Sequence, residues 1–176
     1  TAMRRRITAK RSWPPDAVFN SIAVTRFINN MMRDGEKSKA QKVFYRAMEL
    51  IKTQTEDNPF KIFQTALKNA APTIEVWPRR VGGASYLIPR TVQNDRRFSL
   101  AVKWLVEGAQ AKKGQPMAKA LAEELILANK GEGRAVKKRE DIQKQAEQNR
   151  AFGHFAWWGR KKNKRSPFFK LNDIVR

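Results

Sequence analysis

Apolar residues recur every three or four positions in five successive segments of the chain, and this periodicity restricts the fold more than any other feature. Such spacing puts the apolar side chains on one face of an α-helix, and that face must be buried against other helices. The predicted helices cover about 21–33, 37–53, 59–71, 94–109 and 116–130. A mainly α-helical, bundle-like domain follows from this pattern.

Local signals support several of these helix starts. Ser21 precedes the first stripe, and Asn58 followed by Pro59 is the typical pair of a cap and a first helical residue. Asn94 or Asp95 is the expected cap of the fourth helix. These residues leave little freedom in where the helices begin.

A sixth helix is predicted from the segment RAVKKREDIQKQAEQNRAFGHF, residues 134–155. Its residues are strong helix formers, yet few are apolar, and the charges run round the whole circumference. A helix of this kind is a solvated surface element or lies on a polyanion.

The helical pattern is interrupted between the third and fourth helices. TIEVWPRR and SYLIPRTV have the composition of two strands, joined through Val81, Gly82 and Gly83. Pro78 and Pro89 each lack a donor for strand pairing, which argues against a larger sheet. We therefore expect a two-stranded β-ribbon at about 73–91 that projects from the helices; a simple exposed connector is the alternative.

The chain carries far more positive than negative charge. Its 37 Lys and Arg against 16 Asp and Glu leave a formal charge of +21, which is typical of a partner of nucleic acid. With 41% hydrophobic residues in 176, one domain is expected at 18–158. Residues 1–17 and 159–176 are predicted basic arms; a remnant of an organelle-import signal is the alternative for the first.

Composition also excludes several functions. The chain has no cysteine and one histidine, so disulfides, a protein-built metal site and a His-based triad are not expected. His154 has neither an orienting partner nor a nucleophile signalled in the sequence. We expect no enzyme, no cofactor and no membrane-spanning segment. A DNA-compacting protein and an RNA-processing enzyme are the competing classes.

Several long motifs resemble the family of ribosomal protein seven of the small subunit, in its bacterial and organellar form. They are RRVGGASYLIP, AVKKRED, AEQNRAFGHF, FNSIAVTRFINNMMRDGEKSKA and LAVKWLVEGA. They follow the order and spacing of the family from about Trp13 to Trp158. The resemblance implies six helices with a ribbon between the third and fourth.

The resemblance also implies a function without bond chemistry. Family members bind the three-prime major domain of small-subunit ribosomal RNA and nucleate assembly of the subunit head. They also line the path of the exit-site transfer RNA and the messenger RNA, beside neighbouring ribosomal proteins of the head and platform.

Two sets of residues carry these expectations. The predicted ribosomal RNA contacts are basic: Arg4, Arg5, Arg6, Lys10, Arg11, Arg96, Arg97, Lys112, Lys113, Lys137, Lys138 and Arg139. The residues expected to face transfer and messenger RNA lie on the ribbon and at the end of the last helix: Arg79, Arg80, Gly82, Gly83, Asn149, Arg150, Phe152, His154 and Phe155.

The chain departs from the family pattern in places. Trp77, Pro78, Gln143 and Ala156 stand where the family usually has other residues, which puts the ligand contacts there in doubt. The 159–176 extension is absent from most bacterial members and has the composition of an RNA-tracking or protein-docking tail, or of a disordered one. Together with the HFAWW ending it favours a mitochondrial ribosome; a bacterial cytoplasmic or plastid ribosome is the alternative.

Overall fold

The computed structural model describes residues 13–157, and this part of the chain contains six α-helices, one two-stranded sheet and a final 3-10 helix. The helices are α1 (Ile22–Met31), α2 (Lys37–Gln54), α3 (Pro59–Ala70), α4 (Asn94–Gln110), α5 (Met117–Asn129) and α6 (Arg134–Gln148). The strands are β1 (Ile74–Val81) and β2 (Ala84–Thr91), and the 3-10 helix is η1 (Arg150–Trp157). The predicted six helices and their ribbon between the third and fourth are confirmed.

Three phenylalanines from the first three helices form the centre of the core. Phe27, Phe44 and Phe63 are fully buried, with ring centroids 5.2 to 5.5 Å apart. Burying a side chain of this size contributes about 1.5–3 kcal/mol each. The apolar stripe of α5, including Leu121 and Leu125, is equally buried against the other helices. The Phe and Leu stripes of the sequence are therefore core.

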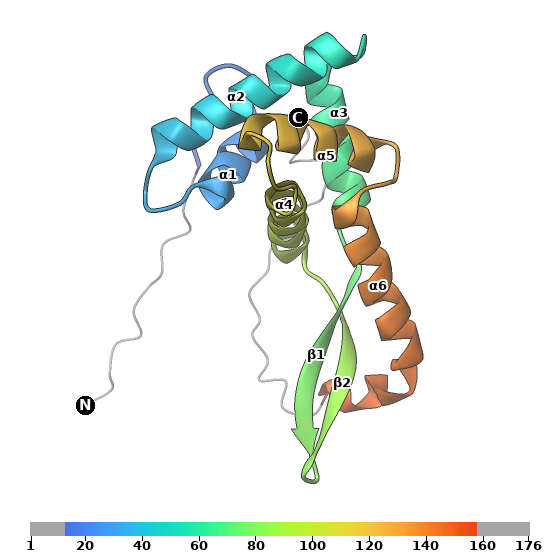
Figure 1. Ribbon diagram of the computed structural model, residues 1–176. Coiled ribbons are helices and arrows are strands. Elements are labelled where there is room, and N and C mark those ends of the chain that lie inside the picture. Colours follow the sequence, from blue (N-terminus) through green and yellow to red (C-terminus); the bar gives the residue numbers. More distant parts are fainter. Residues whose placement is uncertain (1–12, 158–176) are drawn as a thin grey trace, which may run out of the picture.

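Helices α1 to α5 gather at one end of the molecule, and the ribbon projects from them toward the opposite end (Figure 1). α6, orange in Figure 1, leaves the helical body beside β1 and runs along the ribbon. η1 then turns against β2, where the Phe152 ring lies 5.0 Å from the Tyr86 ring. The ribbon is thus a projection, as predicted, but it is supported along one side.

The ribbon turns through its glycine pair. Val81 pairs with Ala84, which leaves Gly82 and Gly83 as the two turn residues, with φ of 58° and 92°. Positive φ at both central positions is the conformation that favours glycine in tight hairpins. The whole sheet consists of these two strands in the described part of the chain. This turn explains why the sequence needs two adjacent glycines.

The helix ends confirm one predicted cap and correct others. Asn58 accepts a hydrogen bond from the Phe60 backbone N–H at 3.0 Å, with Pro59 in the first turn. Ser21 stands at the cap of α1 but its side chain makes no cap bond. The cap position of α4 is Gln93, without a side-chain cap bond, and both Asn94 and Asp95 lie inside the first turn, where Asp95 pairs with Arg26 at 3.3 Å.

The last helix is shorter than predicted. α6 ends at Gln148, and the residues that follow adopt the tighter η1. The Asn149 side chain donates to the carbonyl of Gln145 at 2.8 Å, which satisfies one of the free acceptors at the helix end. The predicted helix end facing transfer RNA is therefore a separate 3-10 element.

Residues just ahead of α1 pack on the helical body. Asp16 is buried and accepts hydrogen bonds from the Val18 and Phe19 N–H groups, both at 3.2 Å. It also accepts a 2.7 Å bond from the Tyr45 hydroxyl. Burial, this bond and the Asp16 charge raise the pKa of Tyr45 to about 12. The arm residues Arg4, Arg5, Arg6, Lys10 and Arg11 lie outside the described residues.

Within residues 13–157, no helix combines the length and the apolar content that a membrane span requires.

Candidate nucleic-acid interface

The ribbon presents a positive surface. Arg80 and Arg90 are exposed, as is Arg79, while the sole acidic residue between Ile74 and Thr91 is Glu75. The Glu75 side chain is only 13% exposed and pairs with Arg96 at 3.3 Å. No free carboxylate therefore opposes a phosphate backbone along the ribbon.

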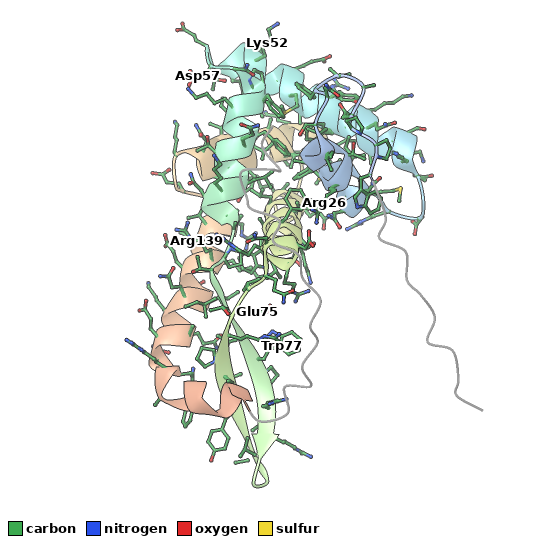
Figure 2. All side chains as sticks on the ribbon, turned by 180° about the vertical axis from the view of Figure 1, so that it is seen from behind. Arg26, Lys52, Asp57, Glu75, Trp77 and Arg139 are labelled. Carbon is green, nitrogen blue, oxygen red and sulfur yellow. The ribbon has the colours of Figure 1, made fainter. Side chains whose placement is uncertain are left out.

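Three arginines predicted to bind RNA fasten the root of the ribbon to the helices. Arg96 holds Glu75, and Arg97 donates through Nε to the carbonyl of Pro72 at 3.1 Å. Arg139 of α6 donates through Nη1 to the carbonyl of Asn69 at the end of α3. Figure 2 shows Arg139 and Glu75 at this junction between the helical body and the ribbon. These three arginines, which were expected to contact RNA, thus bind groups of the protein itself.

Asn69 makes further hydrogen bonds at this junction. Its side-chain amide donates to the carbonyls of Ala128 and Asn129, at 2.9 and 3.1 Å, at the end of α5. Together with the Arg139 bond, this ties the ends of α3 and α5 to α6. The Nε atom of Arg139 is buried and has no hydrogen-bond partner within the described part of the chain. The ribbon root is held from three elements.

A groove of about 430 Å³ separates α4 from α6. Its basic residues come from α6: Arg134, Lys137 and Lys138. Lys138 donates to Glu107 of α4 at 2.7 Å and is therefore neutralised. Lys137 and Arg134 are exposed and pair with no acid among residues 13–157. Of the predicted group Lys137, Lys138 and Arg139, Lys137 is thus the one whose charge is open to an external anion.

Lys112 and Lys113, which follow α4, also differ in their surroundings. Lys112 lies 3.2 Å from Glu123 and 3.9 Å from Glu124, and its side chain is 23% exposed. Lys113 is exposed. Adjacent lysines that are alike in sequence therefore have different surroundings.

Glu124 is a buried acidic residue that sequence analysis did not identify. Its side chain is fully buried, and Oε1 accepts a hydrogen bond from the Ala135 N–H at 3.1 Å in the first turn of α6. A carboxylate at a helix N-terminus is favoured by the exposed N–H groups and the helix dipole. Glu124 thereby fixes where the basic helix α6 begins. Its position on the apolar face of α5, between Leu121 and Leu125, was the available signal.

The residues expected to face transfer RNA are brought to one end of the molecule. Gly82 and Gly83 form the tip of the ribbon, and Phe152 of η1 packs against Tyr86 of β2. Asn149 and Arg150 lie where α6 passes into η1. His154 and Phe155 also belong to η1, and their side chains fall outside the described part. The ribbon and the end of α6, distant in sequence, are thus neighbours.

Negative charge collects at the opposite end. Glu49, Glu56 and Asp57 border a groove of about 880 Å³ where α2 ends and α3 begins. Figure 2 shows Asp57 at the end of the molecule far from Trp77 on the ribbon. Lys52 borders the same groove, so its charged lining consists of three acids and one base and, unlike the ribbon, is net negative. Within residues 13–157, no cluster of three or more His, Cys, Asp or Glu side chains is arranged to hold a metal ion.

Known proteins match almost the whole chain. The Ribosomal protein S7p/S5e family matches residues 3–150. The chain is 50% identical over 155 residues to small ribosomal subunit protein uS7 of Thermotoga maritima, which covers 88% of this chain and 100% of that protein. The protein of the same name from Thermosipho melanesiensis is 50% identical and that from Kosmotoga olearia 49%, with the same coverage. With a positive ribbon beside a basic helix and matches of this extent, the chain belongs to the ribosomal protein S7p/S5e family.

Proposed function

We propose that this protein is a structural constituent of the small ribosomal subunit that binds the three-prime major domain of the ribosomal RNA and nucleates assembly of the head. Membership of a ribosomal family supports the structural, non-enzymatic role. The observation that carries the RNA-binding part is the ribbon, which has three exposed arginines and whose sole acid is already paired. Such a surface is complementary to phosphates.

The structure suggests which cations make external contacts. Lys113 and Lys137 are exposed, and the basic arm Arg4, Arg5, Arg6, Lys10 and Arg11 remains part of the proposal. Arg96, Arg97 and Arg139 act first on the ribbon root, and Lys112 on Glu123 and the buried Glu124. We assign these four residues the role of shaping the RNA-binding surface.

The proposal extends to the exit-site transfer RNA and the messenger RNA. The ribbon tip and η1 lie together at the end farthest from the acidic groove, which supports a shared ligand for both. Neighbouring proteins of the head and platform complete the set of partners. The relatives reported above are bacterial, so the proposal is for a bacterial-type ribosome; they lend no support to the mitochondrial expectation.

A competition assay near physiological salt tests the main proposal. The full chain is offered the three-prime major domain of ribosomal RNA, duplex DNA and a scrambled RNA of equal length. We expect a preference of about 10³ or more for the folded ribosomal RNA, as specific complexes show. A ratio near one would instead favour a general architectural protein.

Replacing Arg79 and Arg80 by alanine tests the finer part in reconstituted subunits. We expect the variant to keep ribosomal RNA binding while losing retention of exit-site transfer RNA. A matched control removes two positive charges from α2, away from the ribbon, by Lys42→Ala with Lys52→Ala, where both side chains are exposed. Equal loss of both activities in the ribbon variant would contradict the division of roles.

A further inference from the structure

Trp77 is an exposed tryptophan in the middle of the ribbon. It is 47% exposed, whereas its partner across the ribbon, Ile88, is 3% exposed. Cross-strand partners share one face of the ribbon, and on this face Ile88 is covered while nearly half of Trp77 stays exposed. Figure 2 shows the Trp77 side chain projecting from the ribbon on the side away from the orange helix α6.

An arginine holds the ring in place. The guanidinium carbon of Arg90 lies 5.8 Å from the centroid of the Trp77 ring, in a cation–π contact. The register puts Arg90 opposite Glu75 and Trp77 opposite Ile88, so Arg90 and Trp77 are diagonal neighbours on adjoining strands. The indole is thus oriented by the protein while nearly half of the residue stays open to a ligand.

The surroundings of the ring select one class of ligand. Arg79, two residues further along the same strand and on the same face, is exposed about 7 Å away, and the nearby Glu75 is neutralised by Arg96. A flat aromatic surface in a positive field suits a polyanion that offers aromatic faces, which describes single-stranded nucleic acid. A duplex hides its base faces inside the stack, and the carboxylate side chains of an acidic peptide have no aromatic face.

We infer that Trp77, backed by Arg90, is a stacking platform for one unpaired RNA base, with Arg79 on the same face of the ribbon positioned for an adjacent phosphate. The inference rests on the proposed function for the presence of RNA, and it adds a site and the form of RNA bound there. The other large exposed aromatic residue of the described chain, Trp13 at 38%, lies off the ribbon and provides a matched control.

The test measures the affinity of the full chain for two probes, a short single-stranded oligoadenylate RNA and a duplex RNA with the same number of phosphates. Trp77→Leu removes the π surface but keeps an apolar side chain suited to a strand. We expect it to weaken single-strand binding roughly 5- to 100-fold and duplex binding less than about twofold. Trp77→Phe should retain most of the affinity, and Trp13→Leu all of it.

Salt dependence separates stacking from charge. Trp77→Leu removes no charge, so the slope of log affinity against log salt should stay that of the parent. Arg79→Gln should lower the slope for the single-stranded probe by about 0.7, because one phosphate contact is lost. A thermal unfolding transition like that of the parent shows that the Leu variant is folded; if it differs, Trp77→Val, which also lacks a π surface and suits a strand, takes its place.

Two results would overturn the inference: unchanged single-strand affinity in Trp77→Leu, or equal weakening for both probes. If the parent chain still prefers the three-prime major domain in competition, such a result refutes the stacking site and leaves the proposed function in place. If the parent shows no such preference, the proposed function itself fails, whatever Trp77 does.

Discussion

Adding one methyl group at Gly108 should destabilise the protein through the buried Glu124. A Cβ at Gly108 of α4 would lie 2.8 Å from Glu124 Oε1 and 2.9 Å from Cδ. The carboxylate cannot easily retreat, because Oε1 accepts the Ala135 N–H at 3.1 Å. On its other side, a Cβ at Gly133 would be 3.0 Å from the same oxygen. Two glycines thus make the space that this carboxylate occupies.

The magnitude follows from two opposing effects. Overpacking in a buried site costs about 1–3 kcal/mol, whereas alanine gains up to about 1 kcal/mol over glycine within a helix. Gly108→Ala should therefore lower the free energy of unfolding by about 1–2 kcal/mol. If Glu124 instead swings away, the Ala135 N–H loses a charged acceptor, which costs a similar amount.

A double-mutant cycle tests this reasoning. Free energies of unfolding are measured by urea denaturation, followed by circular dichroism, for the parent, Gly108→Ala, Glu124→Ala and the double variant. In the Glu124→Ala background the clash is gone, so Gly108→Ala should stabilise by about 0.5–1 kcal/mol. The sign of the effect reverses, giving a coupling energy of about 2 kcal/mol. Additive effects within about 0.5 kcal/mol, or stabilisation of the parent, would refute the argument.

Three further predictions concern single side chains. The pKa of Tyr45 is raised from 10.0 to about 12, so the unfolded chain releases this proton first and stability should fall as the pH rises from 10.0 to about 12. Tyr45→Phe should lack this alkaline loss in unfolding experiments across that range; an identical pH profile would contradict the assignment. Asn58→Ala should cost about 1 kcal/mol in urea denaturation by removing the cap of α3, and an unchanged midpoint would mean that the cap is not used. Lys137→Gln should weaken RNA binding and reduce the salt slope by about 1 with little change in stability, whereas Arg139→Gln should lower the free energy of unfolding by about 1–2 kcal/mol. Equal stability of these two variants would contradict the role of Arg139 at the ribbon root.

The sequence by itself determined the elements of this fold. The three-to-four spacing of apolar residues located the helices, and Asn58 with Pro59 located the start of α3, because these signals act within a few residues of the backbone. Gly82 and Gly83 determined the ribbon turn for the same reason, since no other residue adopts that backbone as readily. The family motifs likewise lie within continuous segments.

The tertiary structure alone decided which charges remain available for a ligand. In sequence, Arg96, Arg97 and Arg139 look no different from Arg80. In the fold, the first three bind Glu75, Pro72 and Asn69, of which the last is 70 positions from Arg139.

Glu124 shows the same limit for an acid. Its environment is formed by Gly108, Gly133 and Ala135, which come from other segments of the chain. A helix pattern reports which face is apolar, but it does not report which polar group from a distant segment meets that face. Local backbone preferences are short-range, whereas hydrogen bonds and ion pairs depend on where packing brings distant segments together. For this protein, local backbone preferences determined the architecture. Hydrogen bonds and ion pairs between distant segments determined which charges remain on the surface.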